Sequence, residues 1–175
     1  MKTLHLLRHA KSSWADPGAD DHARPLNKRG RRAAELMAGH VAALAGPPEL
    51  ILASDAARTR ETLQPIAAAL PRPARVLIER ELYLAPCERL LARLRRVEEE
   101  VAVVLLIAHN PGLHELALRL AAGQPRAAQR FGKFPTAALV TFAVSDAWRG
   151  LDAGGARFRD YVTPGDLSPS DGDDD

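Results

Sequence analysis

Short apolar runs alternate with longer segments of helical periodicity along most of the chain. The runs expected to form strands cover residues 3–8, 50–53, 75–78, 101–108, 137–144 and 156–158. Helices are expected to begin at Asn27, at Ser54 or Asp55, at Pro86, and at Pro111 or Gly112. The run at residues 101–108 is apolar without interruption, as expected of a strand covered on both faces. This alternation predicts an α/β fold, a three-layer α/β/α sandwich around a mixed, mainly parallel sheet.

The charge of the chain is unevenly distributed. Residues 160–175 contain six Asp and no Lys or Arg, so removing them from the net charge of +2 leaves +8 for residues 1–159. A basic body suits an anionic ligand. The basic residues do not interleave with aromatic residues, so nucleic acid is not the expected partner. We expect one domain over residues 1–165 and an acidic, disordered tail over residues 166–175.

Several functional classes are disfavoured by what the chain lacks. No apolar run reaches the roughly 18 residues needed to cross a bilayer, and no signal peptide precedes the first strand, so we expect no membrane partner and a cytoplasmic location. Cys87 is the only cysteine, which excludes an internal disulfide framework and a cysteine-rich metal site. Nothing in the sequence indicates the oligomeric state.

Polar residues follow three of the predicted strands directly. Arg8 and His9 follow the first strand, Ser54 to Arg58 follow the second, and His109 follows the buried run at 101–108. Because parallel sheets place their sites at the carboxyl ends of the strands, we expect these groups to share one site. A neutral imidazole can accept a phosphoryl group, and a guanidinium in the first turn of a helix suits an anion. Each group alone could equally be a capping residue or a solvated charge.

Four ordered motifs resemble the histidine phosphatase superfamily, also called phosphoglycerate mutase-like. They are the strand followed by Arg8-His9-Ala, then Arg24-Pro-Leu-Asn-Lys-Arg-Gly30, Ser54-x-x-x-Arg58, and Ala-His109-Asn. The resemblance extends from about Lys2 to Thr141. The short length, the His109-Asn-Pro-Gly motif and the late Phe134-Pro-Thr segment resemble the small SixA-type phosphohistidine phosphatases.

The resemblance implies a role for each matching residue. His9 matches the nucleophile of the family, and Arg8, Arg58 and His109 match the pocket that binds the phosphoryl oxygens. Ser12 stands where many members place a phosphate-binding hydroxyl group. Arg24 either reaches the substrate or anchors its loop. Arginine and histidine can stabilise the transferred phosphoryl group without a metal, so no metal or other cofactor is expected.

The general acid is not fixed by the motifs. Glu81 is the first candidate because it follows the third predicted strand, where the family has its acid, and Glu79 is the second. Asp16, Asp20 and Asp21 in the early loop form the third. SixA-type members can do without the usual acid, because phosphohistidine already has a good leaving group.

The sequence thus predicts a phosphatase that works through a phosphohistidine on His9. The expected substrate is a phosphorylated protein carrying phosphohistidine, because short loops imply an open site. The alternative within the same enzyme class is a phosphatase of small phosphate esters such as sugar phosphates. A minor alternative is a phosphate-binding module without turnover.

Overall fold

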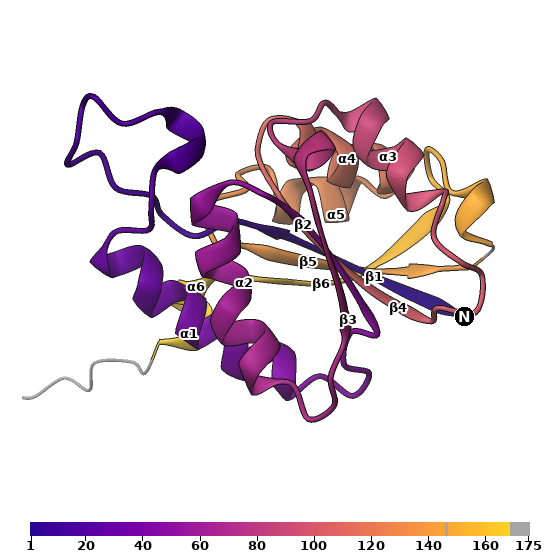
Figure 1. Ribbon diagram of the computed structural model, residues 1–175. Helices are drawn as coiled ribbons and strands as arrows, with labels where there is room; N and C mark the ends of the chain where they lie inside the picture. Colours follow the sequence, from indigo (N-terminus) through magenta and orange to yellow (C-terminus); the bar gives the residue numbers. More distant parts are fainter. Residues whose placement is uncertain (146, 169–175) are drawn as a thin grey trace, which may run out of the picture.

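A six-stranded sheet forms the centre of the computed structural model, which describes residues 1–145 and 147–168 (Figure 1). The strands are β1 (Lys2–Arg8), β2 (Leu50–Ser54), β3 (Arg75–Glu79), β4 (Val103–Ala108), β5 (Leu139–Val144) and β6 (Ala156–Val162). Their order is β3-β2-β4-β1-β5-β6. Neighbours from β3 to β1 pair in parallel, whereas β5 pairs antiparallel with both β1 and β6. The mixed, mainly parallel sheet is confirmed.

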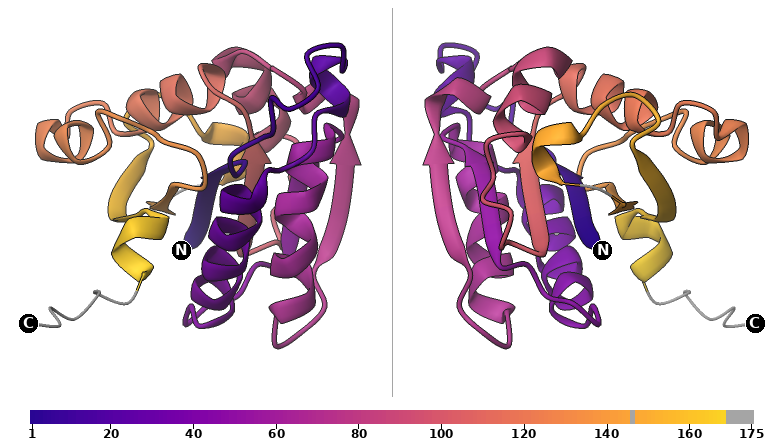
Figure 2. Two further views of the ribbon diagram at one scale, coloured as in Figure 1. Left: turned by 90° about the vertical axis from the view of Figure 1, so that its left-hand side faces the viewer. Right: turned by 90° about the vertical axis from the view of Figure 1, so that its right-hand side faces the viewer.

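Helices cover both faces of this sheet, which confirms the three-layer sandwich (Figure 2). One face packs against α1 (Lys28–Ala42), α2 (Ala57–Ala69) and the short α6 (Pro164–Leu167); the other packs against α3 (Cys87–Leu94), α4 (Gly112–Leu120) and α5 (Pro125–Arg130). Within β4, Leu106 contributes to the core under α3 and α4, and its neighbours Leu105 and Ile107 contribute to the core under α1 and α2. This double burial explains the unbroken apolar run.

Some boundaries differ from the prediction. The N-cap of α2 is Ala56, not Ser54 or Asp55, because Ser54 still belongs to β2 and its hydroxyl accepts a hydrogen bond from the Ala56 N–H at 3.3 Å. The helices α5 and α6 have no counterpart in the predicted elements. The proposed domain boundary after residue 165 falls inside α6, and residues 169–175 of the expected tail lie outside the described residues. No helix among the described residues is long and apolar enough to span a bilayer.

Candidate functional site

A cleft of about 530 Å³ opens at the carboxyl ends of β1 and β4. Six of the predicted site residues line it together: Arg8, His9, Ser12, Arg24, Arg58 and His109. The early loop between β1 and α1, indigo in Figure 1, extends beyond the strand ends. The topology therefore brings together side chains that are up to about a hundred positions apart in the sequence.

His9 directly follows β1 and is only 7% exposed. Its Nδ1 lies 2.7 Å from the carbonyl oxygen of Ala10. Because a carbonyl can only accept, Nδ1 carries the proton and Nε2 keeps its lone pair. That Nε2 faces Arg58, whose Nε lies 3.3 Å away. Burial lowers the pKa of His9 to about 4, and the positive charge of Arg58 adds to this effect, so the imidazole is neutral near pH 7.

His109 follows β4 and is buried beside His9, with 5.0 Å between the ring centroids. Its Nε2 lies 2.7 Å from the Ser54 hydroxyl, while its Nδ1 lies 3.4 Å from a terminal nitrogen of Arg58. Burial lowers the pKa of His109 to about 3, with His9 contributing as well. The arginine donates, so Nδ1 of His109 is its unprotonated nitrogen. Both histidines thus direct a neutral, lone-pair nitrogen toward the same guanidinium group.

Arg58 joins the two histidines to the early loop. It lies in the first turn of α2 and is 4% exposed. Besides the histidines, it donates to the backbone carbonyl of Asp21 at 2.6 Å and to the Asp21 carboxylate at 3.1 Å. Arg58 is therefore a buried cation with an anion already bound to it.

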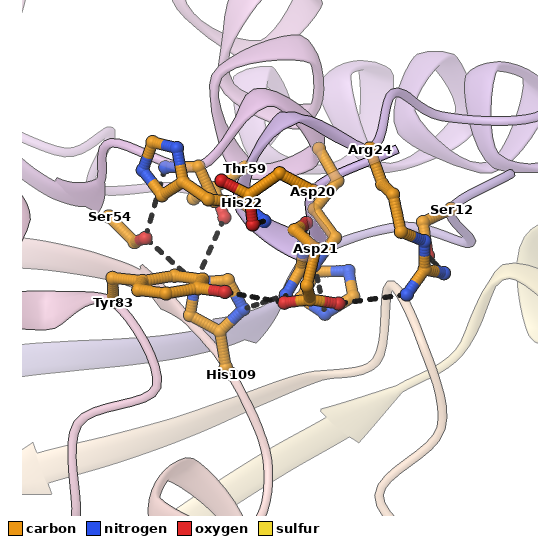
Figure 3. A network of polar contacts seen from close by, with 12 residues as sticks. Ser12, Asp20, Asp21, His22, Arg24, Ser54, Thr59, Tyr83 and His109 are labelled. Carbon is orange, nitrogen blue, oxygen red and sulfur yellow. Dashed lines mark hydrogen bonds and ion pairs between the residues drawn. The ribbon is translucent and has the colours of Figure 1, made fainter. Parts of the chain in front are cut away.

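The Asp21 carboxylate is the focus of the polar network drawn in Figure 3. It accepts hydrogen bonds from the Tyr83 hydroxyl at 2.5 Å and from Arg24 at 2.9 Å, in addition to Arg58. The Tyr83 hydrogen bond and Arg58 hold the pKa of the Asp21 carboxyl below its usual value. Its side chain is still 45% exposed. A half-exposed carboxylate thus occupies donors that also suit phosphate oxygens.

Arg24 ties the early loop to the wall of the cleft. Its guanidinium donates to the Ser13 carbonyl at 3.0 Å and to the Ser12 hydroxyl at 2.6 Å. The same group lies 3.2 Å from the ring centroid of Trp14, a side chain that is 76% exposed. Arg24 therefore anchors the loop and also lines the cleft, so both roles left open by the sequence fit its position.

Arg8 approaches the cleft from the end of β1. One terminal nitrogen donates to the Phe134 carbonyl at 3.0 Å, which Asn110 also contacts at 2.9 Å. The buried Nε of Arg8 has no hydrogen-bond partner among the described residues. Burial lowers the pKa of Arg8, followed by repulsion from Arg58. A half-buried guanidinium with a buried, unbonded Nε, beside a second guanidinium, is costly without an anion.

Glu81, the first candidate for the acid, lies outside this cleft. Its carboxylate is 2.6 Å from Arg96, and both side chains are exposed. Glu79 is bound by Arg93 through three hydrogen bonds of 2.8 to 3.0 Å. Of the early-loop candidates, Asp21 contacts Arg58, a residue that lines the cleft, whereas Asp16 bonds to the N–H of Gly18 and Asp20 to that of His22. The carboxylate that the structure brings to Arg58 is thus one from the third group.

Three residues that contact the site were not predicted from the sequence: Tyr83, Trp14 and Thr59. Tyr83 packs edge-on against His109 at 5.4 Å between ring centroids. Thr59 lies 3.4 Å from Nε2 of His109. An aromatic residue within a polar loop was the available signal for Trp14, whereas Thr59 and Tyr83 become visible only through the fold. Among the described residues, no three His, Cys, Asp or Glu side chains are grouped so that they could hold a metal ion.

Comparisons with known proteins agree with this arrangement. A model of the histidine phosphatase superfamily (branch 1) matches residues 4–83. The uncharacterized protein Rv1276c of Mycobacterium tuberculosis is 34% identical over 162 residues, which cover 90% of this chain and 99% of that protein.

Two solved structures are also similar. A structure from Agrobacterium tumefaciens, provisionally assigned as the phosphohistidine phosphatase SixA, is 31% identical, with a TM-score of 0.80 over 93% of this chain and 98% of its own. The protein histidine phosphatase SixA complexed with tungstate is 25% identical, with a TM-score of 0.78 over 95% of this chain and 99% of its own.

Proposed function

This chain belongs to the histidine phosphatase superfamily (branch 1), and from that membership we propose that it hydrolyses phosphohistidine in a protein through a phosphoryl intermediate on His9. The observation that carries the proposal is the state of His9. Its Nδ1–H is fixed by the Ala10 carbonyl, and its Nε2 is unprotonated at neutral pH and directed at Arg58. A rigid, neutral imidazole beside a guanidinium is a competent phosphoryl acceptor.

In the first step, Nε2 of His9 attacks the phosphorus while the bond to the leaving group breaks. Arg8, Arg58 and His109 surround the position that the equatorial oxygens would occupy. Two fixed guanidinium groups stabilise the charge of those oxygens in the transition state, where most of the rate enhancement of phosphoryl transfer arises. The incoming phosphoryl group takes over donors of Arg58 that Asp21 now occupies.

In the second step, the oxygen of a water molecule attacks the phosphorus, the bond to Nε2 breaks, and phosphate leaves. Asp21 is suited to accept the proton of that water, because its lowered pKa keeps it ionised. An ionised Asp21 cannot protonate a leaving group in the first step. A phosphohistidine suits such a site, because its imidazole leaves readily and can take a proton from solvent.

One observation favours the second candidate, a phosphatase of small phosphate esters. Asp21 contacts Arg58 and Arg24, which line the cleft, and a bound phosphoryl dianion would raise its pKa, which would allow it to act as an acid for an alkoxide leaving group.

Assays in parallel on a phosphohistidine peptide, an aryl phosphate and a panel of sugar phosphates decide between the candidates. We expect the peptide to have the highest kcat/KM and the sugar phosphates the lowest. A sugar phosphate that exceeds the peptide would assign the enzyme to small esters. Binding of phosphate without turnover of any compound would make the protein a phosphate-binding module.

A further inference from the structure

A second groove continues from the cleft, between the start of α1 and α6. We call it the basic groove; its volume is about 480 Å³. Lys11, Arg29 and Thr136 line both the cleft and this groove, whereas Arg32 and Pro164 line only the groove. Because the two share part of their walls, a molecule that places a phosphoryl group at His9 can extend into the basic groove.

The groove carries positive charge that the described part of the chain does not neutralise. Lys11, Arg29 and Arg32 are exposed, and no carboxylate of the described residues lies within 4.0 Å of them. Asp166 of α6 is engaged with Thr163, accepting from its N–H at 2.8 Å and from its hydroxyl at 2.7 Å. Arg29 and Arg32 are three residues apart on α1, where like charges repel.

The groove between β3 and α3 provides an internal comparison. It is lined by three arginines and three glutamates. The three pairs are Arg75–Glu98 at 2.5 Å, Arg93–Glu79 at 2.8 Å and Arg96–Glu81 at 2.6 Å. Every cation in that groove is balanced inside the fold. Of these two grooves, the basic groove, which adjoins the cleft, is the one whose cations remain available to an anion.

The backbone holds part of the basic groove in place. A Cβ atom on Gly30 would lie 2.1 Å from the carbonyl oxygen of Lys11, so the first turn of α1 can approach this segment only because residue 30 is glycine. The Asn27 N–H also donates to the Lys11 carbonyl, at 3.0 Å. The backbone that carries Lys11 is thereby held against the first turn of α1, which carries Arg29, before any ligand binds, and this lowers the entropic cost of binding.

The size and the rim of the combined site favour a macromolecule. Together the cleft and the basic groove are far larger than a phosphorylated side chain requires. Two apolar side chains on the cleft, Trp14 and Leu84, are 76% and 51% exposed. Exposed aromatic and apolar residues near arginines are typical of protein interfaces.

We propose that the basic groove binds acidic side chains of the phosphorylated substrate protein, close to its phosphohistidine. This inference rests on the proposed function. Charge complementarity of this kind accelerates association and excludes substrates with basic surroundings.

Three phosphohistidine peptides that differ in flanking charge test the proposal, with glutamates, glutamines or lysines at the same positions. In the parent protein at low ionic strength we expect a KM about tenfold lower for the glutamate peptide than for the glutamine peptide. The difference should shrink at high salt. Arg32→Glu should abolish this preference and favour the lysine peptide. Arg72→Glu makes the same charge change at an exposed position between α2 and β3, and should keep the parent preference.

An unchanged preference in Arg32→Glu would overturn the basic groove as a docking site and leave the proposed function intact. So would equal KM values for the three peptides both in the parent and in a variant in which the aspartates at 171 and 173–175 are replaced by Asn. No hydrolysis of any peptide, together with turnover of an aryl phosphate, would overturn the proposed function itself. A preference that emerges only after the aspartates at 171 and 173–175 are replaced by Asn would mean that the chain fills its own groove. Preference for a second phosphate on a small ester would assign the groove to small molecules.

Discussion

Arg58 and Arg93 are the same residue type at similar burial, 4% and 8% exposed, and each contacts a carboxylate. Arg93 is bound by Glu79, a residue of β3, through three hydrogen bonds. Arg58 contacts the carboxylate of Asp21, on an early loop, only once. Its other donors reach the Asp21 backbone carbonyl and two neutral histidines. Glu79 thus holds Arg93 firmly, whereas another anion can replace the Asp21 carboxylate at Arg58. Arg58 is therefore a candidate for phosphate binding because its carboxylate partner can be replaced. Burial alone does not distinguish it from Arg93.

Two buried histidines, His9 in the cleft and His5 in the core, differ in the same way as the two arginines. Replacing His9 should have the largest effect on turnover. Burial lowers the pKa of both His5 and His9 to about 4. However, His5 does not line the cleft, and its Nδ1 contacts the hydroxyl of Thr141 on the neighbouring strand β5. His9→Asn should reduce turnover at least about a thousandfold, or about 4 kcal/mol. His5→Asn should leave kcat of the folded enzyme nearly unchanged. Comparable losses in the two variants would remove the distinction between cleft and core.

The same two histidines should share one pH signature. An unfolded histidine titrates near pH 6.5, whereas folded His5 and His9 titrate near 4, so the unfolded state binds more protons between these values. Stability therefore falls as pH decreases from about 6.5 to 4, by on the order of 3 kcal/mol per histidine. Urea unfolding across this range should show a shallower pH dependence in either Asn variant. An unchanged slope would mean that these imidazoles have the same pKa in the folded protein as in the unfolded chain.

The two arginines should separate activity from stability. Arg58→Ala should lower turnover about a hundredfold, or about 3 kcal/mol, with little change in the free energy of unfolding. Arg58→Lys should not restore the rate, because a point charge cannot replace the planar fork. Arg93→Ala should cost about 2 to 3 kcal/mol of stability, because it leaves Glu79 unpaired, and should keep the activity of the folded fraction. Arg60, two positions on and exposed, is the control for Arg58. If Arg58→Ala and Arg60→Ala lose similar, small amounts of activity, Arg58 has no role at the phosphoryl group.

Replacing either of two carboxylates, Asp21 or Glu81, should have the smallest effect on activity, and the effect should depend on the substrate. Asp21→Asn should reduce hydrolysis of a phosphohistidine peptide about tenfold, less than the usual range for acid–base catalysis, if Asp21 activates the water. A much larger loss on an alkyl phosphate would identify Asp21 as an acid and favour small esters. Glu81→Gln should change no rate by more than about twofold, because Glu81 pairs with Arg96 at the surface. A leaving-group-dependent loss in Glu81→Gln would restore it as the general acid.

The sequence predicted the three layers, and it predicted that the residues following β1, β2 and β4 share one site. Both predictions rest on the alternation of strands and helices, which local hydrophobic periodicity encodes. It could not predict the position of Glu81. That residue also follows a strand, but β3 is at the sheet edge and is separated from β1 by β2 and β4, about 14 Å at the usual strand spacing. Strand order is not encoded in the periodicity of a single strand. The path of Asp21 likewise depends on tertiary anchors such as Arg24 and Tyr83, for which a polar loop gives no pattern.

The central claim is that His9 carries the phosphoryl group during turnover. Rapid acid-free quenching of the enzyme with a labelled aryl phosphate, followed by peptide mapping, measures this directly. We predict one phosphoryl group per chain on His9, stable to base and labile to acid, which forms within the first turnover and decays at a rate compatible with kcat. Turnover by an enzyme that never carries label on His9, or by the His9→Asn variant at a similar rate, would contradict the account.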